Sequence, residues 1–189
     1  MEVQILFIVV VGDGQILLMA ENMALVGCIG GTSIVDVTDS VREVSFIPGP
    51  SVGWREAKTW SHYAYVVTES NGSDDSLQGV YIIDLSPLPD SAVLVKRYVY
   101  YIGGNDTKYF HEIAITDGYM YLIGCADWSP GGVVMFSLAD PENPVYVGQY
   151  QPSYIHDAFV RNDTLFGAAI NPNGGIFIAD IHERALESH

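Results

Sequence analysis

One pattern of apolar and polar positions occurs four times along the chain. Each copy begins with a glycine, continues with mostly apolar residues and ends with a small polar residue before a turn. The copies are GTSIVD at 31–36, GVYIIDLS at 79–86, GVVMFS at 132–137 and GIFIAD at 175–180. Their first glycines lie 48, 53 and 43 residues apart. A period in this range is typical of repeat proteins, so the sequence predicts an array of similar units.

Around each copy, the sequence predicts short antiparallel strands separated by turns. In the third repeat the expected strands are Glu112–Ile115, Tyr119–Gly124, Val133–Leu138 and Val145–Gln149. The fourth repeat is expected to stop after its third strand, at Ile181. No stretch has convincing helical periodicity, and the glycine-led strand is apolar on both faces, as a sandwiched middle strand requires. The sequence therefore predicts an all-β repeat array of about four four-stranded blades, as in a β-propeller that is partial or completed by another copy.

The domain boundaries follow from the repeats. A single propeller-like domain is expected over 24–181, with blades at about 24–50, 54–101, 110–150 and 154–181. Residues 1–23 are interpreted as lead-in strands or a weakly signal-like segment, since the apolar run after Ile5 has no basic start and is interrupted by Asp13. Residues 182–189 form a tail.

Four motifs in order resemble the LVIVD-repeat β-propellers known as the choice-of-anchor B family. They are GTSIVDVTD at 31–39, WRE at 54–56, HEIAI at 111–115 and YIHDA at 154–158. The resemblance covers roughly Ala24 to Ile181, and it implies a secreted or cell-surface protein with no established biochemical activity. The family's propellers are larger and carry an anchor that is not evident here. A fragment, or a homo-oligomer that completes the ring, would account for the difference.

The charge balance excludes some partners. Eight Lys and Arg residues stand against 23 Asp and Glu residues, for a formal net charge of −15. Such a surface repels nucleic acid and anionic membranes, so cations or partners with basic patches are expected instead. No apolar run approaches the roughly 18–20 residues of a membrane-spanning helix.

The most pointed chemical feature is an acid beside a basic residue in three successive repeats. The pairs are Arg55–Glu56, His111–Glu112 and His156–Asp157. If first strands line a central channel, the three acids form a ring that could hold Ca²⁺ or another divalent cation. The competing interpretation is structural, with each acid capping backbone amides or pairing with a basic residue. Neighbours in a strand point to opposite faces, so acid and base share a face only if a bulge intervenes.

Two further sets of residues are candidates for more modest roles. Asp36, Asp84 and Asp180 each end a middle strand, and Ser137 replaces them in the third repeat, which favours turn-forming hydrogen bonds over metal binding. Trp128, in the loop ADWSP, is a candidate for stacking on a sugar.

The sequence thus favours a non-catalytic binding or display module with a protein or glycan ligand. One alternative is a hydrolase or lyase that uses the histidine–acid pairs as acid and base. The other is a structural segment of a larger surface protein.

Overall fold

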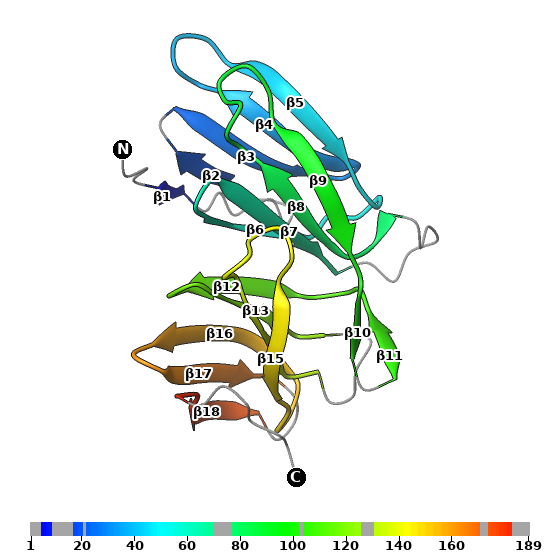
Figure 1. The fold of residues 1–189 in the computed structure, drawn as a ribbon, viewed down its shortest axis with the longest axis vertical. Helices are drawn as coiled ribbons and strands as arrows, with labels where there is room; N and C mark the ends of the chain where they lie inside the picture. Colours follow the sequence, from blue (N-terminus) through cyan, green and yellow to red (C-terminus); the bar gives the residue numbers. More distant parts are fainter. Residues whose placement is uncertain are drawn as a thin grey trace. The chain divides into compact units, whose positions relative to one another are not determined.

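The computed structural model describes residues 5–8, 17–20, 22–69, 77–102, 104–125, 131–170 and 174–182. Nearly all regular structure in these residues is β-strand, and every strand pair is antiparallel (Figure 1). The predicted all-β repeat array is therefore confirmed, while its closure into a propeller stays a prediction. In the described part of the chain, no helix is long and apolar enough to cross a membrane.

The chain divides into two compact units, residues 1–99 and 100–189, and each unit is described by itself. The N-terminal unit contains two sheets, ordered β1-β2-β3-β4-β5 and β6-β7-β8-β9. The strands of the first sheet are β1 (Ile5–Ile8), β2 (Leu17–Ala20), β3 (Met23–Cys28), β4 (Gly31–Asp36) and β5 (Arg42–Pro48). Those of the second are β6 (Arg55–Trp60), β7 (Tyr63–Thr68), β8 (Val80–Asp84) and β9 (Val93–Tyr98).

The C-terminal unit contains a short hairpin and two larger sheets. The hairpin pairs β10 (Tyr100–Ile102) with β11 (Asn105–Thr107). The third repeat forms a sheet of β12 (Glu112–Thr116), β13 (Tyr119–Ile123), β14 (Val133–Ser137) and β15 (Val145–Tyr150). The fourth forms a sheet of β16 (Ile155–Arg161), β17 (Thr164–Ala169) and β18 (Gly175–Asp180).

The residue that ends each glycine-led strand builds the same turn in all four repeats. Its side-chain oxygen accepts a hydrogen bond from the backbone N–H two residues later. The distances are 2.9 Å from Thr38 N to Asp36, 2.8 Å from Ser86 N to Asp84, 3.3 Å from Ala139 N to Ser137 and 2.9 Å from His182 N to Asp180. The turn-forming role predicted for these residues is confirmed.

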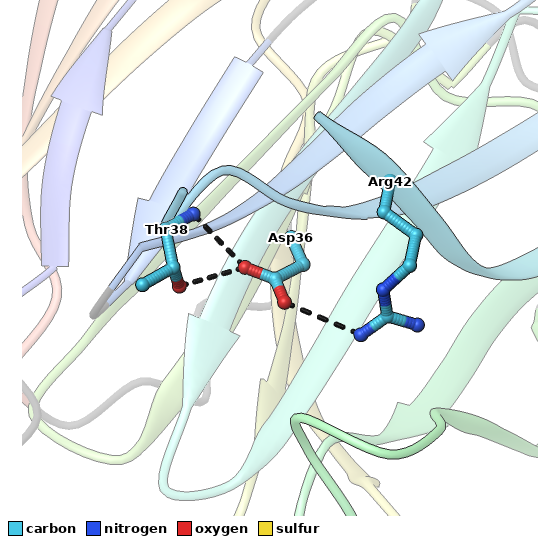
Figure 2. A network of polar contacts seen from close by, with 3 residues as sticks. All are labelled: Asp36, Thr38 and Arg42. Atoms are coloured by element: carbon cyan, nitrogen blue, oxygen red, sulfur yellow. Dashed lines mark hydrogen bonds and ion pairs between the residues drawn. The ribbon is translucent and has the colours of Figure 1, made fainter. Parts of the chain in front are cut away.

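Asp36 has further contacts that strengthen its turn (Figure 2). Its Oδ1 also accepts a bond from the Thr38 hydroxyl at 2.7 Å, and its Oδ2 lies 3.2 Å from Arg42 Nη2. The bonds from the hydroxyl and the N–H of Thr38, with a smaller effect of Arg42, lower the pKa of the Asp36 carboxyl below its ordinary value. The carboxylate form is therefore the one that this turn stabilises.

A second bond, also common to all four repeats, ties this turn to the preceding hairpin. The N–H of the next residue donates to the carbonyl of the hairpin's second turn residue, at 2.7 to 2.8 Å. The pairs are Val37 with Asn22, Leu85 with His62, Leu138 with Gly118 and Ile181 with Asp163. In each repeat, two hydrogen bonds in addition to those between paired strands thus stabilise the turn at one end of the sheet.

Within each unit, the two larger sheets bury apolar side chains against each other. In the N-terminal unit, the core joins Leu25 and Ile34 of the first sheet to Val66 and Ile83 of the second. In the C-terminal unit, the core lies between β12–β15 and β16–β18 and includes the following residues: Tyr121, Ile123, Val133, Met135, Ala158, Val160 and Leu165. Burial of two sheet faces is what holds neighbouring repeats together.

Candidate functional site

The three acids singled out in the sequence occupy equivalent positions in their hairpins. On the neighbouring strand, Glu56 pairs with Val67, Glu112 with Ile123 and Asp157 with Ala168. Each acid also lies four residues before the end of its strand. The strands end at Trp60, Thr116 and Arg161, respectively. Their alignment across the repeats therefore agrees with the register of the sheets.

The basic residues do not align in the same way. Arg55 pairs with Thr68, but the equivalent ladder position in β16 is held by Ile155, which pairs with Ala169. The register shifts between Ile155 and Asp157, so His156 is the extra residue of a β-bulge. The alignment of His156 with Arg55 was therefore one residue out, because a bulge cannot be read from spacing alone.

Arg55 serves as a structural link between the first and second repeats. It is only 2% exposed, and its Nε donates to Cys28 O at 2.8 Å. Its Nη2 donates to Pro50 O in a short hydrogen bond and lies 3.4 Å from Ile29 O. Burial lowers the pKa of the guanidinium below its ordinary value. These carbonyls belong to the ends of strands and loops in the first repeat, so Arg55 holds two sheets together.

The equivalent acids have different surroundings. Glu56 is buried and forms a short ion pair with Lys58, two residues along the same strand. Glu112 is half-buried, and Asp157 is exposed. Glu56 belongs to the N-terminal unit and the other two acids to the C-terminal unit. The ring of carboxylates around a channel therefore stays a prediction, although Glu56 already has a structural partner.

Two histidines from neighbouring sheets come together in the C-terminal unit. The ring centroids of His111, before β12, and His156, in β16, lie 3.8 Å apart with planes tilted by 46°. The ring of Tyr154 is 6.4 Å from that of His156. His111 is buried, whereas His156 and Tyr154 are half-buried. We call His111, Tyr154 and His156 the histidine–tyrosine cluster.

Gly124 allows the cluster to approach the strand beside it. Its φ is +64°, and a Cβ at this position would lie 2.8 Å from His111 Cβ and 3.1 Å from the Tyr154 hydroxyl. Only glycine combines this backbone conformation with so little space. Neither Gly124 nor Tyr154 was recognised from the sequence as part of a site. The available signal was a glycine directly after an apolar strand, facing a histidine-led strand.

Other predicted site features are not tested by these contacts. Trp128 lies outside the described residues. Within the described ranges, no group of three or more His, Cys, Asp or Glu side chains is placed to hold a metal ion. No known protein family matches the sequence, and no curated protein matches it either. The resemblance to LVIVD-repeat propellers therefore remains an expectation from four short motifs.

Proposed function

We propose that this protein is a non-catalytic binding or display module, secreted or on the cell surface, whose ligand contacts the histidine–tyrosine cluster. The observation that carries the proposal is the close packing of the tilted rings of His111 and His156, from two repeats, with centroids 3.8 Å apart and Tyr154 beside them. The secreted or surface location rests on the resemblance alone.

Comparison of the four repeats distinguishes residues with a structural role from candidate binding residues. The turn-forming oxygen occurs in all four repeats, whereas the ladder position of Arg55 is occupied by Ile155 in the fourth. A side chain that every repeat needs is explained by folding. The cluster is built from residues that other repeats lack, and a bulge places one of them. This makes the cluster the better candidate for a role beyond folding.

The chemistry of the cluster favours a neutral glycan. Imidazole and phenol rings have apolar faces that pack on the C–H face of a sugar and polar atoms that bond its hydroxyls. A net charge of −15 disfavours acidic glycans at the same surface.

Binding and turnover should be measured in parallel on the full chain. A panel of neutral glycans serves for binding, and chromogenic glycosides and esters serve for activity. We expect glycan binding that weakens at least tenfold in His111→Gln and His156→Gln but not in His62→Gln. His62 is the matched control, since its half-exposed side chain belongs to a hairpin turn of the other unit. Equal binding by all three variants would refute the proposal.

The enzyme alternative is favoured by one specific feature, the bulge at His156. The bulge interrupts the alternation of side chains and brings a second imidazole beside His111, so one ring could act as acid and the other as base. Turnover of any substrate in the panel that disappears in both histidine variants would support this alternative.

The divalent cation expected from the acids is tested separately. A structural ion would stabilise the folded state by mass action, so chelation should lower the melting temperature by several degrees. An unchanged melting temperature would remove the cation from the proposal.

A further inference from the structure

The last sheet of the chain has one apolar face that is exposed. Cross-strand pairing aligns Phe159, Phe166 and Ile178 in one row, and Ile176 lies in the next row beside Ala168 (β16, β17 and β18 in Figure 1). These four large side chains are 60%, 38%, 65% and 71% exposed, respectively. The two phenylalanine rings lie 6.4 Å apart. We call these four residues the terminal face.

The preceding sheet shows what covers such a face. By strand register, the positions equivalent to Phe159, Phe166, Ile176 and Ile178 in the third repeat are Ala114, Tyr121, Val133 and Met135. All four of these residues pack in the core against the β16–β18 sheet, and Tyr121, Val133 and Met135 are fully buried there. The terminal face thus repeats, position by position, a surface that is an established sheet-to-sheet interface in this chain.

The same strand register identifies a face of the first sheet as the surface that would pack against the terminal face. The face of β16–β18 that covers the third repeat includes Leu165, Gly167, Phe177 and Ala179. In the first sheet, the equivalent positions are Ala24, Val26, Ser33 and Val35. Ala24 and Ser33 are buried and smaller than their equivalents Leu165 and Phe177. Val26 and Val35 are half-buried, and they are larger than Gly167 and Ala179. The small side chains of Ala24 and Ser33 leave room there for large residues of a facing sheet.

We propose that the terminal face is an interface for a second copy of this chain, which covers it with the Val26–Val35 face of its first sheet. Each copy has both surfaces, so the contact between copies is head-to-tail: the terminal face of one copy meets the first sheet of the next. Exposed apolar faces of this kind mark interaction sites rather than ordinary surface. This inference is independent of the proposed glycan binding, since none of its residues belongs to the histidine–tyrosine cluster.

The charge of the protein gives the interface a recognisable salt dependence. Two chains of net charge −15 repel each other, and added salt screens this repulsion without weakening apolar burial. The association is therefore expected to tighten as NaCl is raised from 0.05 to 0.5 M, on the order of tenfold.

The test is the mass of the full chain in solution, measured by light scattering and sedimentation over a concentration series. We expect a mass of at least twice the 20.7 kDa of one chain, which rises with protein concentration until the association is complete. Ile178→Asp and Val35→Asp should each shift the protein to the monomer. Val145→Asp is the matched control, because Val145 is also 61% exposed on an outer strand but lies outside both faces.

Circular dichroism and thermal melting must show that each variant remains folded. If Ile178→Asp does not fold, Phe166→Ser provides a milder change in the same row of the face. A wild-type monomer at all concentrations, or an association that weakens with salt, would overturn the proposal. Dissociation by Ile178→Asp but not by Val35→Asp would overturn the first sheet as the partner surface.

Discussion

Arg55 offers the sharpest test of how the repeats are held together. Replacing Arg55 by Met keeps most of the side chain's length and apolar contacts but removes the guanidinium. The backbone carbonyls of Cys28 and Pro50 then lose their bonds, as does the more distant carbonyl of Ile29. We expect this substitution to destabilise the N-terminal unit strongly.

The expected magnitude follows from the number and type of bonds. Hydrogen bonds to a charged donor contribute about 1.5–3 kcal/mol each, so the two closer bonds of Arg55 together suggest a loss of about 3–6 kcal/mol. For a unit of this size, each kcal/mol lowers the melting temperature by about 4–8 °C, so the expected decrease is at least roughly 12 °C. Urea unfolding monitored by circular dichroism measures the free energy directly.

Burial of the guanidinium acts in the opposite direction. The same desolvation that lowers the pKa of Arg55 is a cost that Met would not incur. If desolvation outweighed the bonds, Arg55→Met would be as stable as the wild type. A loss below about 1 kcal/mol would thus refute the conclusion that Arg55 links the sheets. Arg55→Lys is the control for charge, and it should be intermediate because an ammonium cannot reproduce the planar fork.

Substitutions at three further positions test the turns and the cluster. Gly124→Ala should cost about 1–3 kcal/mol, since alanine is strained at this φ and its Cβ would meet His111, and the loss is measured by urea unfolding. Asp36→Asn should destabilise the protein at pH 7, and progressively less as the pH falls below about 4. The folded pKa of Asp36 lies below the unfolded value of 3.8, so its contribution is present above about pH 4 and is lost as the pH falls through the folded pKa, as melts across this range would show. An unchanged difference between the two proteins at pH 2 would contradict this linkage. Ser137→Asp should stabilise by about 0.5 kcal/mol, because a carboxylate accepts a stronger bond than the 3.3 Å bond of the hydroxyl, while Ser137→Ala should destabilise.

The sequence was most informative where structure depends on neighbouring residues. The turns at Asp36 and Ser137 were predicted correctly, because the acceptor and the donor stand two residues apart and the motif recurs in every repeat. The strands were predictable for the same reason, since alternation and turn residues are local signals. The hairpin at Asp117–Gly118 has positive φ values of 51° and 77°, which are typical of an Asp-Gly turn.

The candidate site was less predictable because its contacts cross from one sheet to another. Arg55 donates to Cys28, 27 residues earlier in the chain, so its structural role cannot be inferred from the residues beside it. His156 meets His111 only because β16 contains a bulge, and spacing does not reveal a bulge. Gly124 has its role through a positive φ and the histidine that packs against it.

The strand position of Arg55 shows that equivalent residues in different repeats have different roles. It is occupied by Arg55 in the second repeat and by Ile155 in the fourth, while His111 directly precedes the third repeat's first strand. Arg55 bonds carbonyls of the preceding sheet, and Ile155 is buried in an apolar core. Because sheet packing accepts either solution, this position can diverge without loss of the fold. A histidine there, packed against a second one supplied by a bulge, is therefore one of several solutions that the repeat accepts, and the proposed binding role rests on this difference between repeats.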